Sequence, residues 1–353
     1  MKKRIRAQVL FSYTYFLIAI VGLFSLLTPS VVWASQEMNS AVSPDAVEKF
    51  GMHILSTDEL SEAQAFLSTE QPDSWHYLTI PFTLEDLEKQ EKWQQFFIAA
   101  REDKIIPIVR LATRVEAGAW VVPNRKNIVD QLDFLAQLSW PTDKKYIIIY
   151  NEVNHAKEWG NTINPEEYAR TLAFGSQWAR SKNNGFVVLP AAMDLAAGST
   201  RITKEAFAYL DSMVAYDPEI FSYVDIWNSH SYPNPGFSAS PQRTGKNSLR
   251  GFEYELTYLK KHTSKELSVF ITETGWEDSA LTRRWLSSYY TYALQHIWSD
   301  ARVLAVTPFV YKGAPGPFAG FSFISASGKP TTQYYAVLQA LKSQKMHQLS
   351  KLQ

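Results

Sequence analysis

The chain has 353 residues, no cysteine, and as many basic as acidic side chains, 35 of each. This length fits one large domain or two ordinary ones, and the balanced charge argues against nucleic-acid binding, which needs a basic excess. The lack of cysteine excludes disulfides, thiolate nucleophiles and metal sites built on cysteine.

The first 34 residues have the pattern of a secretory signal peptide. Basic residues crowd the start of the chain, and residues 7–36 then carry no charge. The small-residue exit Val32-Trp33-Ala34 predicts cleavage after Ala34. The uncharged stretch could also span a bilayer, which takes about 20 residues, so a membrane tether through residues 7–34 is the alternative. Either way, we expect an extracytoplasmic protein, secreted or anchored to the membrane.

The remaining chain is expected to form one domain. Residues 35–47 are polar and read as a linker, residues 48–345 as the folded domain, and residues 346–353 as a tail. Asn164 followed by Pro165 is typical of a helix start, because proline suits the first helical position.

Stretches typical of strands and of helices alternate from residue 48 onward. The strands recur at intervals of roughly 30 to 40 residues, which is what a strand and its crossover helix need. Eight such units predict a (β/α)8 barrel, also called a TIM barrel, with a doubly wound open sheet as the alternative. No glycine-rich phosphate loop follows any strand, which disfavours the open sheet. The predicted strands are Phe50–Leu55, Tyr77–Phe82, Ile105–Leu111, Tyr146–Tyr150, Phe186–Pro190, Val224–Asn228, Leu267–Thr272 and Val303–Val310.

Polar residues follow several predicted strands directly. The fourth strand runs into Asn151-Glu152-Val153-Asn154, the sixth into His230-Ser231-Tyr232, and the seventh into Glu273-Thr274-Gly275-Trp276. In a closed barrel the C-terminal ends of the strands meet on one face. Two glutamates, Glu152 and Glu273, are therefore expected to face each other across the mouth of the barrel.

Two opposed carboxyl groups suit the hydrolysis of a glycosidic bond. One must be protonated to assist the departing oxygen, and the other must be ionised to attack the anomeric carbon or to activate water. A glutamate of ordinary pKa, about 4.3, is ionised at neutral pH, so the acid of the pair needs a raised pKa. Burial and a neighbouring carboxylate both raise it, so the pair supplies part of this effect itself.

The Asn-Glu sequence after the fourth strand and the glutamate after the seventh resemble clan A, a large group of retaining glycoside hydrolases with (β/α)8 barrels. The His-x-Tyr after the sixth strand is also similar to members of this clan. The resemblance implies that Glu152 is the acid/base and Glu273 the nucleophile. It further implies that Asn151 bonds the sugar 2-hydroxyl, that Tyr232 orients the nucleophile, and that His230 lines the site.

The chain departs from the clan's pattern at two places. Clan members often have an arginine from the second strand near the nucleophile, whereas the nearest candidate here is Arg110, at the end of the third. Members usually carry a tryptophan on the eighth strand beneath the sugar, whereas Phe309 or Tyr311 would take that place here. These departures leave the family within the clan and the glycan open.

Further residues are candidates for sugar binding. Trp120, Trp159 and Trp276 lie on predicted loops above the mouth and could stack on sugar rings, with packing inside the loops as the alternative. Asn154 either contacts the substrate or caps the turn. No His-x-His or His-Glu-x-x-His pattern occurs, so neither a metal nor another cofactor is expected.

The sequence therefore predicts a retaining glycoside hydrolase that acts, as a monomer, on a β-linked oligo- or polysaccharide. A non-catalytic carbohydrate-binding barrel is one alternative, although such a protein gains little from two opposed acids. A metal-dependent TIM-barrel hydrolase is another, which a chelator would distinguish.

Overall fold

The computed structural model describes residues 42–182 and 185–350. Ser43–Gln353 form one compact unit. The predicted signal peptide or anchor over residues 1–34 lies outside the described residues, as does most of the predicted linker. In the described part of the chain, no helix is both long enough and apolar enough to cross a bilayer.

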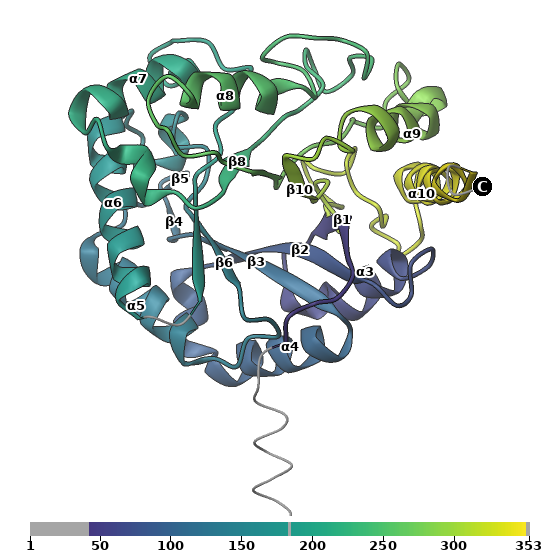
Figure 1. Cartoon of the computed structure of the whole chain (residues 1–353), viewed down its shortest axis with the longest axis horizontal. Helices are drawn as coiled ribbons and strands as arrows, with labels where there is room; N and C mark the ends of the chain where they lie inside the picture. Colours follow the sequence, from purple (N-terminus) through teal and green to yellow (C-terminus); the bar gives the residue numbers. More distant parts are fainter. Residues whose placement is uncertain (1–41, 183–184, 351–353) are drawn as a thin grey trace, which may run out of the picture. The chain divides into compact units, whose positions relative to one another are not determined.

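Eight parallel strands form a barrel surrounded by helices (Figure 1), which confirms the predicted (β/α)8 fold. They lie in the order β7-β6-β3-β2-β1-β10-β9-β8. The strands are β1 (Val47–His53), β2 (Trp75–Phe82), β3 (Ile105–Leu111), β6 (Lys145–Ile149), β7 (Phe186–Pro190), β8 (Trp227–Ser229), β9 (Val269–Ile271) and β10 (Val303–Val306). The helices around them are α3 (Leu60–Leu67), α4 (Gln90–Glu102), α5 (Arg125–Gln137), α6 (Pro165–Ser181), α7 (Ala206–Tyr216), α8 (Gly251–Leu259), α9 (Leu286–His296) and α10 (Thr332–Ser350).

The barrel closes between β7 and β8, the two ends of this order. The amide of Asp225 donates to the carbonyl of Val188 at 2.9 Å, and the Asp225 carboxylate accepts from the Val188 amide at 2.9 Å. Beyond the strands, Asp194 and His230 form a parallel bridge. One side chain therefore replaces part of the backbone pairing, and the loop after β7 is held beside His230.

The central strands are buried on both faces because their sequences are almost entirely apolar. In β3, which reads Ile-Ile-Pro-Ile-Val-Arg-Leu, every residue except Arg110 is buried. Tyr77, Tyr146 and Phe270 fill the barrel interior, with ring centroids 5.0 to 5.9 Å apart. The filled interior leaves the mouth as the place where a ligand can bind, as expected for this architecture.

Several predicted boundaries differ from the structure by a few residues, among them the two that follow. The eighth strand was expected to reach Val310, but β10 ends at Val306 because the following backbone bonds to other loops. The amide of Phe309 donates to the carbonyl of Thr274 at 3.0 Å, and that of Tyr311 donates to His53 at 2.8 Å. At the other boundary, α10 extends to Ser350, so residues 346–350 of the predicted tail are helical.

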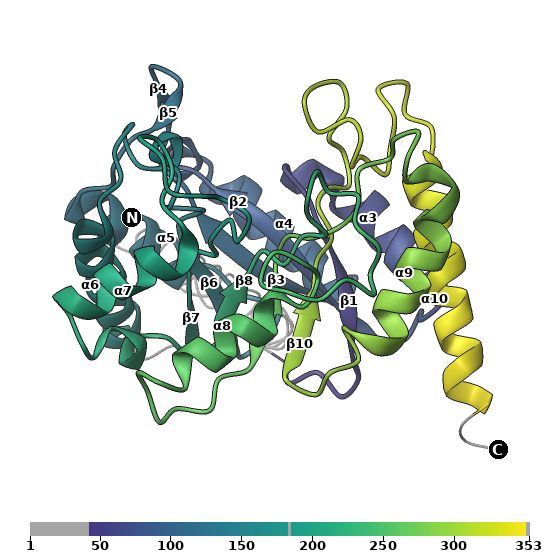
Figure 2. The same ribbon diagram turned by 90° about the horizontal axis from the view of Figure 1, so that it is seen from above.

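A short hairpin after β3 extends the mouth of the barrel. It consists of β4 (Val115–Glu116) and β5 (Ala119–Trp120), which pair antiparallel. Figure 2 shows the hairpin and the loops that follow β10 projecting from the same end of the barrel. These segments form the rim around the strand ends that carry the predicted site.

Candidate active site

The backbone turns sharply where β6 ends and Glu152 begins the next loop. Tyr150 and Glu152 have positive φ angles, 67° and 32°. A residue other than glycine in this region costs roughly 1–2 kcal/mol, so the rest of the fold must hold the turn in place. Strain of this kind gathers at functional sites, and here it places Glu152 at the mouth.

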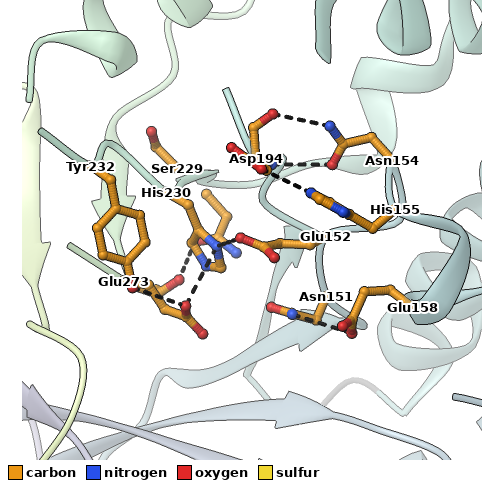
Figure 3. A network of polar contacts seen from close by, with 12 residues as sticks. Asn151, Glu152, Asn154, His155, Glu158, Asp194, Ser229, His230, Tyr232 and Glu273 are labelled. Carbon is orange, nitrogen blue, oxygen red and sulfur yellow. Dashed lines mark hydrogen bonds and ion pairs between the residues drawn. The ribbon is translucent and has the colours of Figure 1, made fainter. Parts of the chain in front are cut away.

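Glu152 and Glu273 lie close together, as predicted from the strand ends. A carboxyl oxygen of each, together with a ring nitrogen of His230, lie within 4.8 Å of one another. His230 Nδ1 is 2.9 Å from Glu152 Oε1 and 3.8 Å from Glu273 Oε2, and Figure 3 shows the imidazole beside both carboxylates. Burial lowers the pKa of His230, but the charges of Glu273 and Glu152 outweigh burial and raise it. The histidine is thus disposed to carry a positive charge next to the two acids.

Glu273 is buried but electrostatically compensated. Arg110 Nη1 donates to Glu273 Oε1 at 2.6 Å, and the Tyr232 hydroxyl donates to Oε2 at 3.3 Å. Burial by itself would raise the pKa of Glu273, but the charges of His230 and Arg110 hold it well below its ordinary value. Glu273 is therefore ionised at neutral pH. The third strand supplies the arginine that the sequence left uncertain.

Asn151 is held from two sides beside this carboxylate. Arg110 Nη1 donates to Asn151 Oδ1 at 2.9 Å, and Asn151 Nδ2 donates to Glu158 Oε2 at 3.4 Å. Glu158 ends the short helix η3 (Ala156–Glu158) and was not predicted. Burial, and then the charge of Glu152, raise the pKa of Glu158. Arg110 thus couples the position of Asn151 to that of Glu273.

A cavity of about 600 Å³ opens onto both glutamates. Its lining combines strand-end residues with residues of the surrounding loops, so that polar groups converge at one point of a largely apolar wall. This combination is typical of a small-molecule or sugar site. Of the predicted residues, those that line it are Arg110, Trp120, Asn151, Glu152, Trp159, Tyr232, Glu273 and Phe309.

Two of the aromatic residues predicted to bind sugar do not line this cavity. Trp276 is fully buried, its ring packs against Tyr290 at 4.9 Å, and its Nε1 donates to the carbonyl of Ala239 at 2.8 Å. Tyr311 is also buried. Both rings support the loops from behind and offer no open face to a sugar. Phe309 is the one of the two strand-eight candidates that reaches the cavity.

Asn154 and Trp159 stabilise the loop that follows β6. Asn154 Nδ2 donates to the carbonyls of Asp194 and Lys204, each at 3.0 Å, and the residue is fully buried. Trp159 lines the cavity but is only 1% exposed, and its Nε1 donates to Glu167 Oε2 at 3.0 Å. Asn154 therefore holds the loop in place. Trp159 contributes very little surface to the cavity wall.

Several cavity residues that come from loops were not among the predicted site residues. His155 Nε2 lies 2.8 Å from Asp194 Oδ2, and this bond is the main cause of a raised pKa at His155. Phe237, Phe318 and Phe321 line the cavity from the loops after β8 and β10. No local pattern marks these residues, because only the closure of the barrel brings their loops together.

The central triad also has donors that a metal could use. Glu152, His230 and Glu273 each offer a ligand atom, as noted above. However, the Arg110 guanidinium lies 2.6 Å from Glu273 and already compensates that carboxylate. A divalent ion would lie against this cation, so the arrangement suits proton transfer better than metal binding.

Comparison with known proteins shows which solved structures share this fold. No protein-family model matches the chain, and no curated protein matches it in sequence. A monomeric β-xylosidase from Caulobacter crescentus CB15 superposes with a TM-score of 0.58 at 16% identity, over 84% of this chain and 69% of that one. An endo-β-1,4-glucanase from Xanthomonas axonopodis pv. citri gives 0.53 at 14% identity, over 86% and 97%. An endo-β-1,3-glucanase from Pseudomonas viridiflava gives 0.51 at 15% identity, over 83% and 98%.

By their titles, these similar structures are a xylosidase and two glucanases. At such identities the likeness establishes the fold, and it agrees with the clan that the strand-end motifs resemble. It singles out no family within the clan.

Proposed function

We propose that this chain is a retaining glycoside hydrolase. The observation that carries the proposal is the pair of carboxyl groups, Glu152 and Glu273, with oxygens within 4.8 Å of each other in one cavity. Retaining enzymes have carboxyl groups about 5–5.5 Å apart, whereas inverting enzymes need about 6.5–9.5 Å to admit a water molecule between acid and base. The close spacing favours a double displacement.

In the first step, Glu273 attacks the anomeric carbon and the bond to the leaving oxygen breaks. Glu152 transfers its proton to that oxygen, so the leaving group departs as a neutral alcohol. Glu273 can attack because its depressed pKa keeps it ionised. The Tyr232 hydroxyl and the Arg110 guanidinium hold one oxygen each, which fixes the direction of attack.

In the second step, water hydrolyses the glycosyl ester on Glu273. Glu152, now a carboxylate, accepts a proton from this water, and the sugar is released with its original anomeric configuration. His230, bonded to Glu152 at 2.9 Å, stabilises the negative charge that Glu152 carries between the two steps.

NMR of the first product formed tests the mechanism. We expect a β-glycoside to give the β-anomer before mutarotation. A 2-fluoro glycoside with a good leaving group should label Glu273, and peptide mass spectrometry would locate the label. An α-anomer as the first product would rule out the double displacement.

Replacing Arg110 by methionine should change the pH profile. Removal of the guanidinium takes away one of the charges that lower the pKa of Glu273, while that of His230 remains, so this pKa rises and the nucleophile is protonated at a higher pH as the pH falls. We expect the acid limb of kcat/KM to move upward by about one to three pH units, with the alkaline limb unchanged. Arg110→Lys keeps the charge, although not both hydrogen bonds, and should shift the limb less. An acid limb that stayed in place in Arg110→Met would contradict this assignment.

The donor atoms of the central triad make a metal-dependent hydrolase the second candidate. Incubation with a chelator separates the two, because the double displacement needs no metal and should keep its full rate. Loss of activity that added metal restores would favour the second candidate.

We further propose a β-linked glycan as substrate, a monomeric state and an extracytoplasmic location. The neighbours named above act, by their titles, on β-xylosides and β-glucans, and the charge pattern of residues 1–36 supports export. Cell fractionation of the full chain and of a form lacking residues 1–34 tests the location. Recovery of the full chain in the cytoplasm would refute it.

A further inference from the structure

The cavity has one wall made almost entirely of phenyl rings. Phe237, Phe309, Phe318 and Phe321, here called the phenylalanine wall, all line it. Their ring centroids are 4.9 Å apart for Phe309 and Phe318, 5.1 Å for Phe237 and Phe321, and 6.4 Å for Phe309 and Phe321. The rings therefore form one continuous apolar surface.

Charged groups lie on the other sides of the cavity. Among the described lining residues, those from the loops after β8 and β10 carry no charge, and Asn234 is the only amide side chain there. Its Oδ1 already accepts the amide of Phe237 at 3.5 Å. The charged lining residues come from β3 and from the loops after β6, β7 and β9: Arg110, Glu152, His155, Lys157, Glu158, Asp194 and Glu273.

The contacts of Glu273, taken together with the clan resemblance, indicate which part of a bound sugar meets the phenylalanine wall. Oε1 faces Arg110, which holds Asn151, whereas Oε2 faces Tyr232. The two ring neighbours of the anomeric carbon are carbon 2 and the ring oxygen. If carbon 2 points to Asn151, as the clan resemblance implies, the ring oxygen and carbon 5 point to Tyr232.

Tyr232 belongs to the same aromatic surface as the phenylalanine wall. Its ring centroid is 5.0 Å from that of Phe237 and 6.2 Å from that of Phe321. In this orientation, carbon 5 and its substituent lie on the side of the cavity that Tyr232 and the phenylalanine wall form. Apart from the Tyr232 hydroxyl and the Asn234 amide, the described side chains on this side of the cavity offer no hydrogen-bond partner. A hydroxyl against the phenyl rings would therefore lose hydrogen bonds to water, whereas a hydrogen or methyl group would gain from burial.

We propose that the site selects a glycone without a hydroxyl on carbon 6, namely a pentopyranose or a 6-deoxyhexose. This inference rests on the proposed function, because it assumes that the sugar is attacked by Glu273. It names the class of sugar on the non-reducing side of the cleaved bond.

One pair of matched substrates isolates the oxygen on carbon 6, and a second pair tests the whole hydroxymethyl group. 4-Nitrophenyl β-D-fucopyranoside and β-D-galactopyranoside differ only at carbon 6, and the β-xyloside and β-glucoside differ only by the hydroxymethyl group. We expect kcat/KM to be about 10- to 100-fold higher for the member without the hydroxyl in each pair. Equal rates, or a preference for the hydroxylated member, would overturn the inference and leave the proposed function standing.

Variants of the phenylalanine wall test its role. Phe237→Tyr and Phe321→Tyr each add a hydroxyl to this surface and should lower the preference ratio. Trp120→Phe alters the opposite rim and should leave the ratio, although not the rate, unchanged. A ratio that responds to Trp120→Phe and to neither tyrosine variant would place the selectivity elsewhere and contradict the proposal.

A binding measurement distinguishes a failure of this inference from a failure of the proposed function. Isothermal titration with isofagomine, and with its analogue that lacks the hydroxymethyl group, measures glycone recognition without turnover. Tighter binding of the smaller analogue supports the inference, and equal or weaker binding contradicts it. If neither compound binds and no aryl glycoside is hydrolysed, the proposed function fails and the inference fails with it.

Discussion

Glu273→Ala is expected to lower kcat by roughly 10⁴- to 10⁶-fold on any glycoside that the protein hydrolyses. In the proposed mechanism this carboxylate attacks the anomeric carbon while Arg110 and Tyr232 hold its oxygens, and a water molecule in its place would be a much weaker nucleophile. The measurement is turnover of an aryl glycoside, with a thermal melt to check folding. The melt is needed because Arg110 loses its partner, and breaking a buried ion pair costs about 3–5 kcal/mol.

Added azide should partly restore turnover of Glu273→Ala, because the small anion fits the space left by the carboxylate. The product would be a glycosyl azide of inverted configuration. Glu59→Gln is the matched control, since Glu59 is a buried glutamate that does not line the cavity. Normal turnover in Glu273→Ala would refute the assignment of Glu273 as the nucleophile. If Glu59→Gln lost as much turnover as Glu273→Ala, the loss could not be attributed to the nucleophile.

Glu152→Gln should lower kcat/KM by about 10²- to 10⁴-fold for substrates with poor leaving groups. An amide cannot donate a proton to the departing oxygen, so an alkoxide would have to leave unassisted. Aryl glycosides with acidic phenols need little assistance and should be affected least. The measurement is kcat/KM across aryl glycosides of increasing phenol pKa, which should fall more steeply in the variant.

Glu158→Gln provides the matched control for Glu152. It lies in the same loop, lines the same cavity and bonds Asn151, but it does not contact His230 in the way Glu152 does. We expect its dependence on the leaving group to follow that of the wild type. A steeper dependence in Glu158→Gln than in Glu152→Gln would exchange the roles of the two glutamates.

The barrel could be predicted because its signals are local. An apolar run such as Ile147–Ile149 has to be buried on both faces, and eight such runs at regular spacing leave few architectures open. The starts of helices could be predicted in the same way. Asn164 Oδ1 accepts from the amide of Glu167 at 3.1 Å, directly before the first-turn Pro165. Strand ends such as Val306 were harder to predict, because a strand ends where its backbone begins to hydrogen-bond to loops instead of to the adjacent strands.

Residues that leave the strand ends were brought together as the sequence predicted, because parallel strands in a barrel must end on one face. Glu152 and Glu273 met for this reason, as did Asn151 and Tyr232. The tryptophans were harder to place. Trp276 lies in the same segment after β9 as Glu273, yet it turns into the core to pack on Tyr290.

The sequence by itself thus determined the barrel, the two carboxylates and their strands. Only the tertiary structure decided that Arg110 compensates Glu273, that Glu158 and Asp194 line the same cavity, and that phenyl rings form one of its walls. The physical reason is the separation along the chain of the residues that make each interaction. Neighbouring residues in the sequence specify which strands are buried and roughly where they end. Ion pairs and loop contacts instead join distant segments that meet only when the barrel closes.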